Sequence, residues 1–329
     1  MAHRPSAPRP STRRTTVLAA LLAGAGLLTA TACSGDDSSD AAGAATTDKS
    51  TVSVTDATGA AVKIPAHPQR VVVLSEMDLD SALTLGIAPV GLTAARGQKG
   101  APGYLADKAA KIPLVGTVTG PDIEKVVAAQ PDVILAGQLA DTQVLAQLRK
   151  VAPTLVTIGK DKDWKSSLTL TGKALGKSNE AKKFLARYDE KAAALKKDLG
   201  TRAGSEVSVA RYSAKGTAVM QQGVFVSDVL KDLGFTRPGI QAKQGEGHST
   251  PISNENLKEI DGDWLFIGTL DPTSESGLLK QLQAEPAYRS LKAVEDKHAT
   301  VVDGSKWTSL GGAQAATSVL ADIRAAMVK

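Results

Sequence analysis

One amphipathic stretch, residues 178–200, divides this chain into two halves. Its apolar side chains recur in steps of three and four, which places them on one face of a helix. They are Ala181, Phe184, Leu185, Tyr188, Ala192, Leu195 and Leu199. Ser178 is suited to cap the start of this helix and Gly200 to end it. At roughly 21 residues the helix would be about 32 Å long, which is enough to run from one lobe of a protein to another.

The sequence on either side of this stretch alternates short apolar runs with helix-like segments. Residues 70–74 (RVVVL) and 264–268 (WLFIG) are continuous apolar runs, typical of parallel strands buried on both faces. Helix-like segments end at Gly86 and Gly234, and residues 51–64 have the pattern of a β-hairpin. The predicted fold class is therefore α/β, with two Rossmann-like lobes that have central parallel sheets and are joined by one long interlobe helix.

The first 32 residues have the pattern of a bacterial signal peptide. Arg13 and Arg14 precede a short apolar run at 17–28, which is too short to span a bilayer. Small residues then lead to Cys33, the only cysteine. This arrangement resembles a lipobox, in which the thiol is lipidated and becomes the first residue of the mature protein. A structural or reactive thiol is the weaker interpretation, and export by the general or the twin-arginine route stays open.

The charge of the chain belongs largely to this signal. The full sequence carries a net charge of +5, and residues 1–32 contain four arginines and no acid, so the mature chain carries +5 − 4 = +1. Nothing in this balance favours nucleic acid as a partner. Residues 34–50 lack large apolar side chains and have the composition of a flexible tether. The predicted organisation is a signal peptide (1–32), lipidated Cys33 with its tether (33–50), a first lobe (51–177), the interlobe helix (178–200) and a second lobe (201–329).

A short pattern occurs once in each predicted lobe. EKVVAAQPDVILA begins at Glu124 and ENLKEIDGDWLFIG begins at Glu255. In both, an Asp follows eight positions after the Glu and a four-residue apolar run comes next. From the residues alone, each Glu is an acid in the first turn of a helix, where the helix dipole stabilises it by about 0.3–1 kcal/mol.

Several stretches together resemble the iron-siderophore substrate-binding proteins of ABC importers, in the class shared with vitamin B12 and haem binders. They include PQRVVVLSEMDLDSALTLGIAPVG, PDIEKVVAAQPDVILA, VFVSDVLKDLGFTRPG, ISNENLKEIDGDWLFIG and KWTSLGGAQAATSVLADI. The resemblance covers nearly the whole chain from Thr51. It implies a monomer that holds a ferric siderophore between its lobes and docks on a permease dimer with a cytoplasmic ATPase. It also implies that Glu124 and Glu255 are the docking acids.

The resemblance favours a hydroxamate siderophore, with one departure. Some hydroxamate binders of this class carry an Arg just before the acid of the first lobe, where this chain has Val118 and Thr119. Catecholate or mixed siderophores, haem and cobalamin therefore stay open as cargo. The siderophore fills the coordination sphere of the iron, so neither a protein metal site nor a cofactor is expected.

Polar ligand residues are expected where strands end. Arg211 follows a short apolar run, and the carboxyl ends of parallel strands are where open α/β sheets bind ligands. The resemblance also implies that an Arg at this position faces the oxygens bound to iron. Arg96 could add a second cation, with a solvated loop charge as the alternative. His248 and Tyr212 are further candidates, although Tyr212 would point the other way if its strand continues.

Aromatic residues make up only 3% of the chain, so each tryptophan needs an account. Trp307 is expected on a loop and favoured as a wall of the ligand site. Trp164 could form a cleft wall or pack at a helix start, and Trp264, within an apolar run, is expected in the core. Met77 and the neighbouring Glu76 come directly after the first apolar strand and are candidates for the cleft.

Two other classes of protein fit the sequence less well. A protein that binds bare metal ions needs three or four converging ligands, whereas the four histidines are scattered along the chain and His3 lies in the signal. An enzyme is the second alternative, but the sequence contains no G-x-S-x-G, H-E-x-x-H or glycine-rich phosphate loop. The favoured interpretation is a binding protein without catalytic activity.

Overall fold

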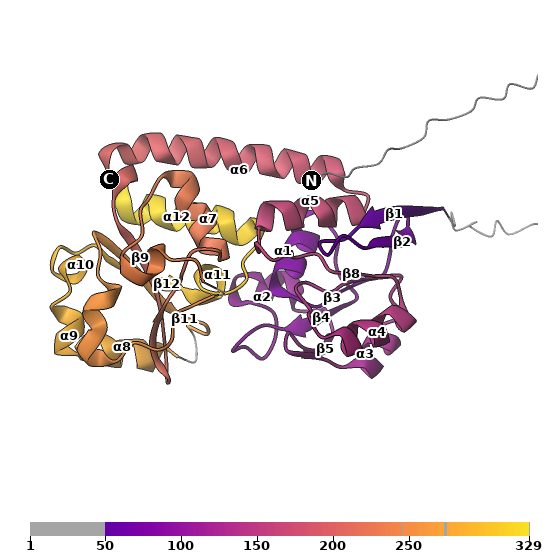
Figure 1. Cartoon of the computed structure of the whole chain (residues 1–329), viewed down its shortest axis with the longest axis horizontal. Coiled ribbons are helices and arrows are strands. Elements are labelled where there is room, and N and C mark those ends of the chain that lie inside the picture. Colours follow the sequence, from indigo (N-terminus) through magenta and orange to yellow (C-terminus); the bar gives the residue numbers. More distant parts are fainter. Residues whose placement is uncertain (1–49, 246, 273–274, 329) are drawn as a thin grey trace, which may run out of the picture. The chain divides into compact units, whose positions relative to one another are not determined.

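The computed structural model describes residues 50–245, 247–272 and 275–328, and residues 48–329 form one compact unit. Within this unit the chain builds two α/β lobes in succession (Figure 1). Parallel sheets in two lobes confirm the predicted fold class. The predicted signal peptide and Cys33 lie outside the described residues.

The first lobe is built on a six-stranded sheet with the order β6-β5-β4-β3-β7-β8. All neighbouring strands are parallel except β5 and β6. The strands are β3 (Val71–Val73), β4 (Gly91–Ala94), β5 (Leu114–Thr117), β6 (Gly120–Pro121), β7 (Val133–Leu135) and β8 (Thr154–Leu155). The helices are α1 (Glu76–Thr84), η1 (Gly103–Leu105), α2 (Ala106–Ala109), α3 (Ile123–Ala128), α4 (Thr142–Val151) and α5 (Trp164–Ala174).

The predicted hairpin precedes this sheet. Strands β1 (Thr51–Thr55) and β2 (Ala61–Pro65) are antiparallel, with Thr51 opposite Pro65. Gly59 lies in the turn at a φ of 88°, a backbone conformation that glycine adopts without strain.

The second lobe has a four-stranded sheet with the order β10-β9-β11-β12. Strands β9, β11 and β12 are parallel, and β10 is antiparallel to β9. The strands are β9 (Val207–Ser213), β10 (Gly216–Val219), β11 (Trp264–Thr269) and β12 (Ala299–Asp303). The helices are α7 (Phe225–Leu233), η3 (Gly239–Ala242), η4 (Asn254–Ile260), α8 (Ser276–Ala284), α9 (Pro286–Arg289), α10 (Lys292–Glu295), α11 (Gly304–Trp307) and α12 (Ala313–Met327).

Helix α6 (Ser178–Leu199) coincides with the predicted interlobe helix and extends alongside both lobes (Figure 1). Its N-cap is Lys177, which makes no side-chain capping hydrogen bond, so the prediction that Ser178 caps the helix is wrong. Gly200 ends the helix at a φ of 58° and leads into η2 (Gly200–Gly204).

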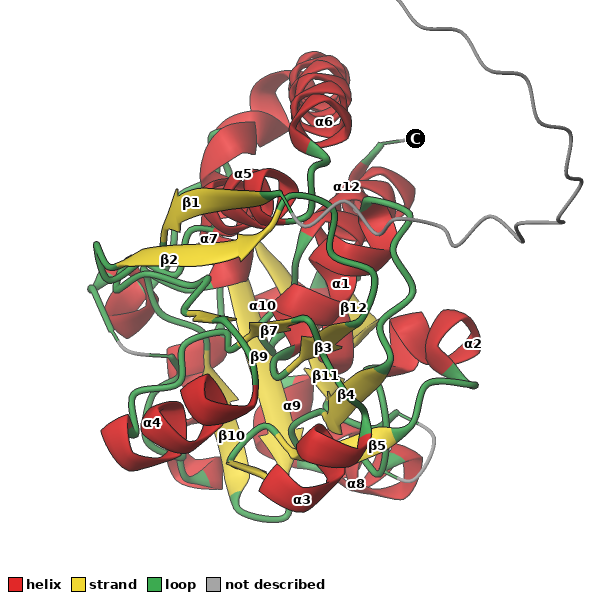
Figure 2. Cartoon of the chain, turned by 90° about the vertical axis from the view of Figure 1, so that its right-hand side faces the viewer, coloured by secondary structure: helices red, strands yellow, loops and turns green. Residues whose placement is uncertain are grey.

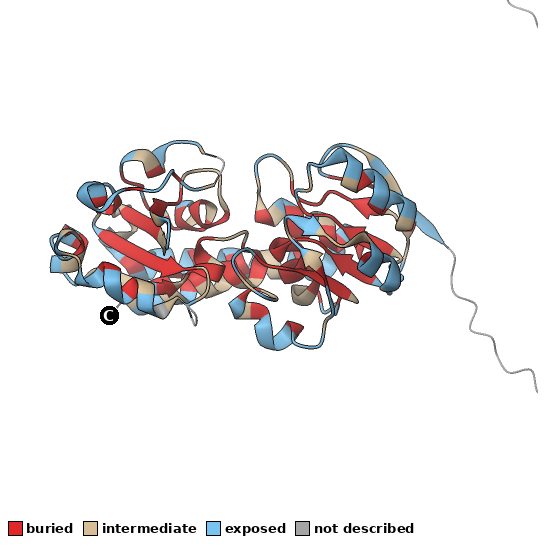
Figure 3. Cartoon of the chain, turned by 90° about the horizontal axis from the view of Figure 1, so that it is seen from below, coloured by how far each residue is buried: buried red, intermediate tan, exposed pale blue. Residues whose placement is uncertain are grey.

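The lobes are also joined by a shared core. One cluster of buried side chains includes Met77 and Trp164 of the first lobe, Leu195 of α6, and Phe225 and Phe266 of the second lobe. Helices α5, α6 and α12 gather on one side of the molecule, away from α3, α4 and α8 (Figure 2). Seen from below, buried residues continue through the middle of the molecule, where the two lobes meet (Figure 3). Because close-packed cores resist deformation, this shared core ties the lobes together along one side.

Candidate functional site

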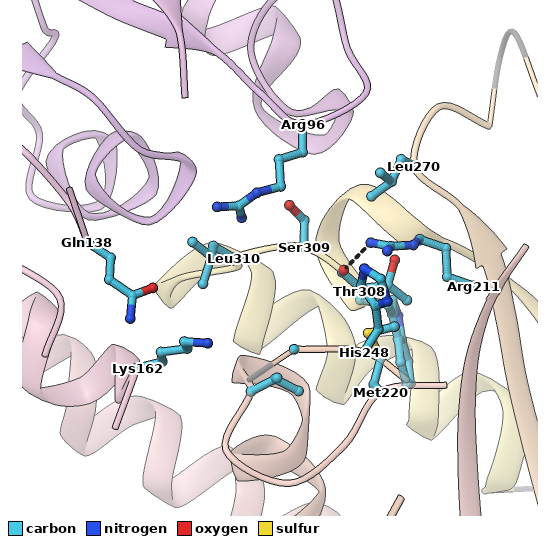
Figure 4. Close-up of a pocket in the computed structure, with 13 residues that line it drawn as sticks. Arg96, Gln138, Lys162, Arg211, Met220, His248, Leu270, Thr308, Ser309 and Leu310 are labelled. Atoms are coloured by element: carbon cyan, nitrogen blue, oxygen red, sulfur yellow. Dashed lines mark hydrogen bonds between the residues drawn. The ribbon is translucent and has the colours of Figure 1, made fainter. Parts of the chain in front are cut away.

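A cavity of about 490 Å³ lies between the lobes and is lined by side chains of both (Figure 4). Arg96 follows strand β4 and Gln138 follows β7, so both lie at carboxyl ends of parallel strands in the first lobe. Arg211 lies towards the carboxyl end of β9, in the second lobe. Open α/β sheets bind ligands at this edge, and the two sheets present it to the same cavity.

Arg211 is held from the second lobe. It is half-buried, and its Nη1 donates to the carbonyl oxygen of Thr308 at 3.2 Å. Burial and the nearby positive charge of Arg96 lower the pKa of Arg211 from its usual value, while Glu275 acts in the opposite direction. The guanidinium is therefore a cation held at the cavity, partly removed from water and close to a like charge.

Arg96 is held by Glu76, the first residue of α1. The backbone N–H of Arg96 donates to Glu76 Oε1 at 3.1 Å, and Arg96 Nη1 lies 3.8 Å from Glu76 Oε2. Ser309, from the second lobe, donates its hydroxyl to the same Oε1 at 3.2 Å. The Glu76 side chain is only 2% exposed and that of Arg96 is 44% exposed. Glu76 thus lies behind Arg96 and connects the two lobes at the edge of the cavity.

His248 and Trp307 also line the cavity. Nδ1 of His248 lies 2.8 Å from the carbonyl oxygen of Ser249, within hydrogen-bond distance. Trp307 is fully buried at the end of α11, stacked on Phe266 and with Nε1 donating to Asp322 Oδ2 at 2.8 Å. The expected loop position of Trp307 is wrong, because Trp307 is the last residue of helix α11. Its ring packs in the core and also contributes to the wall of the cavity.

Three other candidates do not line the cavity. Trp164 begins α5, is fully buried and packs edge-on against Tyr188. It therefore packs at a helix start, the second of its two predicted roles, and does not form a wall of the cleft. Met77 is fully buried in the shared core. Tyr212 lies half-buried on β9, which continues past it, and packs against the second lobe's own core. Trp264 is buried on β11, as predicted.

The cavity also contains residues that the sequence analysis did not single out. They include Gln138, Lys162, Met220, Ser309 and Leu310. Gln138 follows an apolar strand, as Arg96 does. Its position at the end of a strand could therefore have predicted it as a ligand residue. Lys162 has a positive φ of 50° in the loop before α5. The local sequence does not predict this conformation.

The two repeated acids lie outside the cavity. Glu124 is exposed in the first turn of α3, which is capped by Asp122. Glu255 is exposed in the first turn of η4, so the second acid also lies at the start of a helix, here a 3-10 helix. The apolar run that ends each copy forms an interior strand of its sheet, β7 or β11.

Neither a metal site nor a membrane span occurs in the described part of the chain. No three His, Cys, Asp or Glu side chains among the described residues are grouped as a metal ion would require. Within the same residues, no helix combines the length and apolar character needed to cross a bilayer.

Two lobes with facing sheet edges and a polar cavity between them define the class of two-lobe solute-binding proteins. The chain belongs to the periplasmic binding protein family, whose model matches residues 71–305.

Curated relatives and solved structures agree with this family. The chain is 32% identical to the probable siderophore-binding lipoprotein YfiY of Bacillus subtilis, over 85% of this chain and 88% of that one. It is 27% identical to the achromobactin-binding periplasmic protein of Dickeya dadantii, over 78% of this chain and 85% of that one. Staphylococcus aureus SirA complexed with staphyloferrin B superimposes with a TM-score of 0.72 at 28% identity, covering 83% of this chain and 97% of SirA.

Proposed function

We propose that this protein captures a ferric siderophore outside the cytoplasm and delivers it to the permease of an ABC importer. The observation that carries the proposal is the cavity between the lobes, where Arg96 and Arg211 face one space from opposite sheets. Ferric siderophores expose oxygens bound to iron, and guanidinium groups donate strong, charge-assisted hydrogen bonds to such oxygens. The cavity is also within the size range of small-molecule sites.

The similar proteins support the choice of cargo. The names of YfiY, the achromobactin-binding protein and SirA with staphyloferrin B all refer to siderophores or to binding them. Haem or cobalamin in the same cavity is the alternative that the fold leaves open. A secreted enzyme is a weaker alternative, since the matched family consists of binding proteins.

The proposed setting is the outer face of the cell membrane. Cys33 would carry the lipid anchor, and the protein would act as a monomer beside a permease dimer with its cytoplasmic ATPase. Exposed Glu124 and Glu255, one in each lobe, would bind that dimer. The name of YfiY as a lipoprotein supports the anchor.

Fluorescence titration tests the proposed cargo. Of the three tryptophans, Trp307 lines the cavity, so an absorbing ferric complex bound there should quench its emission. We expect at least one ferric siderophore to quench the purified protein at sub-micromolar concentration. Trp307→Phe should remove most of the quenching and Trp164→Phe should keep it. The proposal fails if no ferric siderophore binds, or if haem or cobalamin binds tightly in their place.

A further inference from the structure

We propose that the cavity selects ferric complexes with a net negative charge, such as tris-catecholates and citrate-type chelates, over neutral or cationic hydroxamate complexes. This inference rests on the proposed function and names the class of siderophore. It differs from the hydroxamate siderophore that the resemblance of the sequence favours.

The first step is the position of the cations. Arg96 comes from the first lobe and Arg211 from the second, and both side chains extend into the same space (Figure 4). Lys162 lines it as well. Among the described residues that line this cavity there is no Asp or Glu. The described residues of the wall therefore include positively charged side chains and no negatively charged ones.

The second step is how far nearby acids offset these charges. Glu76 is the ion-pair partner of Arg96, but it is nearly buried and receives the Ser309 hydroxyl as well. Arg211 has no carboxylate oxygen within 4.0 Å in the described chain, and its printed hydrogen bond goes to the neutral carbonyl of Thr308. Glu275 is a charged neighbour that favours the cationic form of Arg211. Arg211 thus keeps donors for a ligand, and no carboxylate of the described residues forms an ion pair with it.

The third step is the cost of keeping two cations together. Burial and the charge of Arg96 both lower the pKa of Arg211, so keeping two cations side by side at this cavity costs free energy. An anion between the two guanidinium groups would relieve this repulsion. Because Arg211 is partly removed from water, that attraction is stronger than it would be at an open surface.

The ligand classes differ in this respect. Three singly charged hydroxamates neutralise Fe³⁺, whereas three doubly charged catecholates, or several carboxylates with a hydroxyl group, leave the complex negative. A neutral complex would rely more on apolar contacts, which Met220, Val224, Leu270 and Leu310 offer at this cavity, but it would gain nothing from the charges of the two arginines. Charge therefore favours the anionic class.

The test measures the affinity of the purified protein for ferric complexes of different charge. The probes are a ferric tris-catecholate, ferric citrate, neutral ferrichrome and cationic ferrioxamine B, each titrated at two salt concentrations. We expect an anionic complex to bind at least about tenfold more tightly than either hydroxamate, with an affinity that falls as salt rises. Tighter binding of ferrichrome or ferrioxamine B would overturn this inference and leave the proposed function intact. Binding of none of these complexes would overturn both.

Matched variants connect the selectivity to the two arginines. Arg211→Gln and Arg96→Gln keep a polar side chain and remove the charge. Each should therefore lower the affinity for the anionic ferric complex about tenfold or more and reduce the salt dependence of that affinity. Arg149→Gln and Arg289→Gln change exposed arginines, one in each lobe, and should leave affinity unchanged. Circular dichroism verifies folding of each variant. Equal losses for anionic and neutral complexes in the cavity variants would contradict selection by charge.

Discussion

Asp80 in the first lobe caps helix α12 in the second lobe through the backbone of Gln314. Asp80 Oδ1 accepts from the N–H of Gln314 at 2.8 Å, and Oδ2 accepts from the N–H of Ala315 at 3.1 Å and from the Tyr104 hydroxyl at 2.8 Å. The N-cap of α12 itself is Gly312, where a Cβ would lie 2.8 Å from Asp80 Cγ. Glycine at this position leaves room for a capping residue from the other lobe.

Asp80→Asn should destabilise the protein by about 1–3 kcal/mol, since one acceptor oxygen becomes a donor that faces N–H groups in a buried site. Urea unfolding measures this loss. Asp141→Asn is the matched control: Asp141 caps α4 at an exposed helix start, where Asn caps equally well. We expect the control to change stability by less than about 0.5 kcal/mol. Equal, small effects of both changes would show that the cross-lobe cap contributes little.

Asp78 should make stability depend on pH. Burial raises its pKa from 3.8 to about 6, while hydrogen bonds from Thr157 and Ser75 act in the opposite direction. The folded state therefore binds this proton more tightly than the unfolded state does. The contribution of Asp78 to stability is largest below about pH 4 and declines as pH rises to about 6, by about 3 kcal/mol at most.

Chemical unfolding at a series of pH values checks this prediction. Asp78→Asn cannot titrate, so the difference in unfolding free energy between wild type and variant should change in favour of the variant between about pH 4 and pH 6. The variant starts less stable because its amide nitrogen cannot accept from the Thr157 or Ser75 hydroxyl. A constant difference across this pH range would contradict a raised pKa for Asp78.

The docking role of Glu124 and Glu255 can be separated from ligand binding. Both acids are exposed and neither lines the cavity. The double change Glu124→Arg with Glu255→Arg should reduce iron uptake by cells at least about tenfold, through repulsion from cationic sites on the permease. Affinity for the ferric complex in solution should stay the same.

A matched control uses exposed acids elsewhere in the chain. Glu190 lies on α6 and Glu295 on α10, and both are exposed. Glu190→Arg with Glu295→Arg makes the same change in net charge and should leave uptake near the wild-type level. Equal loss of uptake in both double variants would show that net charge, and not specific docking, is responsible. Loss of affinity for the ferric complex in the Glu124→Arg, Glu255→Arg variant would place these two acids at the ligand.

Prediction from the sequence succeeded where the physical signal is local. Residues 70–74 include strand β3, and residues 264–268 make up all but the last residue of β11, because an unbroken apolar run is typical of a strand buried on both faces. Helix α6 coincides with its apolar periodicity. The helix expected at the second copy of the repeated pattern forms as the 3-10 helix η4, since the same local pattern is compatible with either type of helix.

Only some of the ligand residues could be predicted, because the local sequence does not show which side chains face the cavity. Arg96, Arg211 and His248 line the cavity. The two arginines could be predicted because Arg96 follows strand β4 and Arg211 lies near the carboxyl end of β9. Met77 follows a strand too, but its side chain points into the shared core. Which side chain after a strand faces a cavity depends on packing against the other lobe, and a single sequence does not encode that packing locally.

The sequence by itself determined two α/β lobes, the long helix between them and the strand ends where ligand residues lie, because periodicity, glycine stops and apolar runs act over a few residues. Only the tertiary structure decided that Asp80 caps a helix in the other lobe, that Glu76 holds Arg96, and that two arginines about 115 positions apart meet at one cavity. These contacts join residues distant in sequence, and they form only when burial of the shared core brings both lobes together.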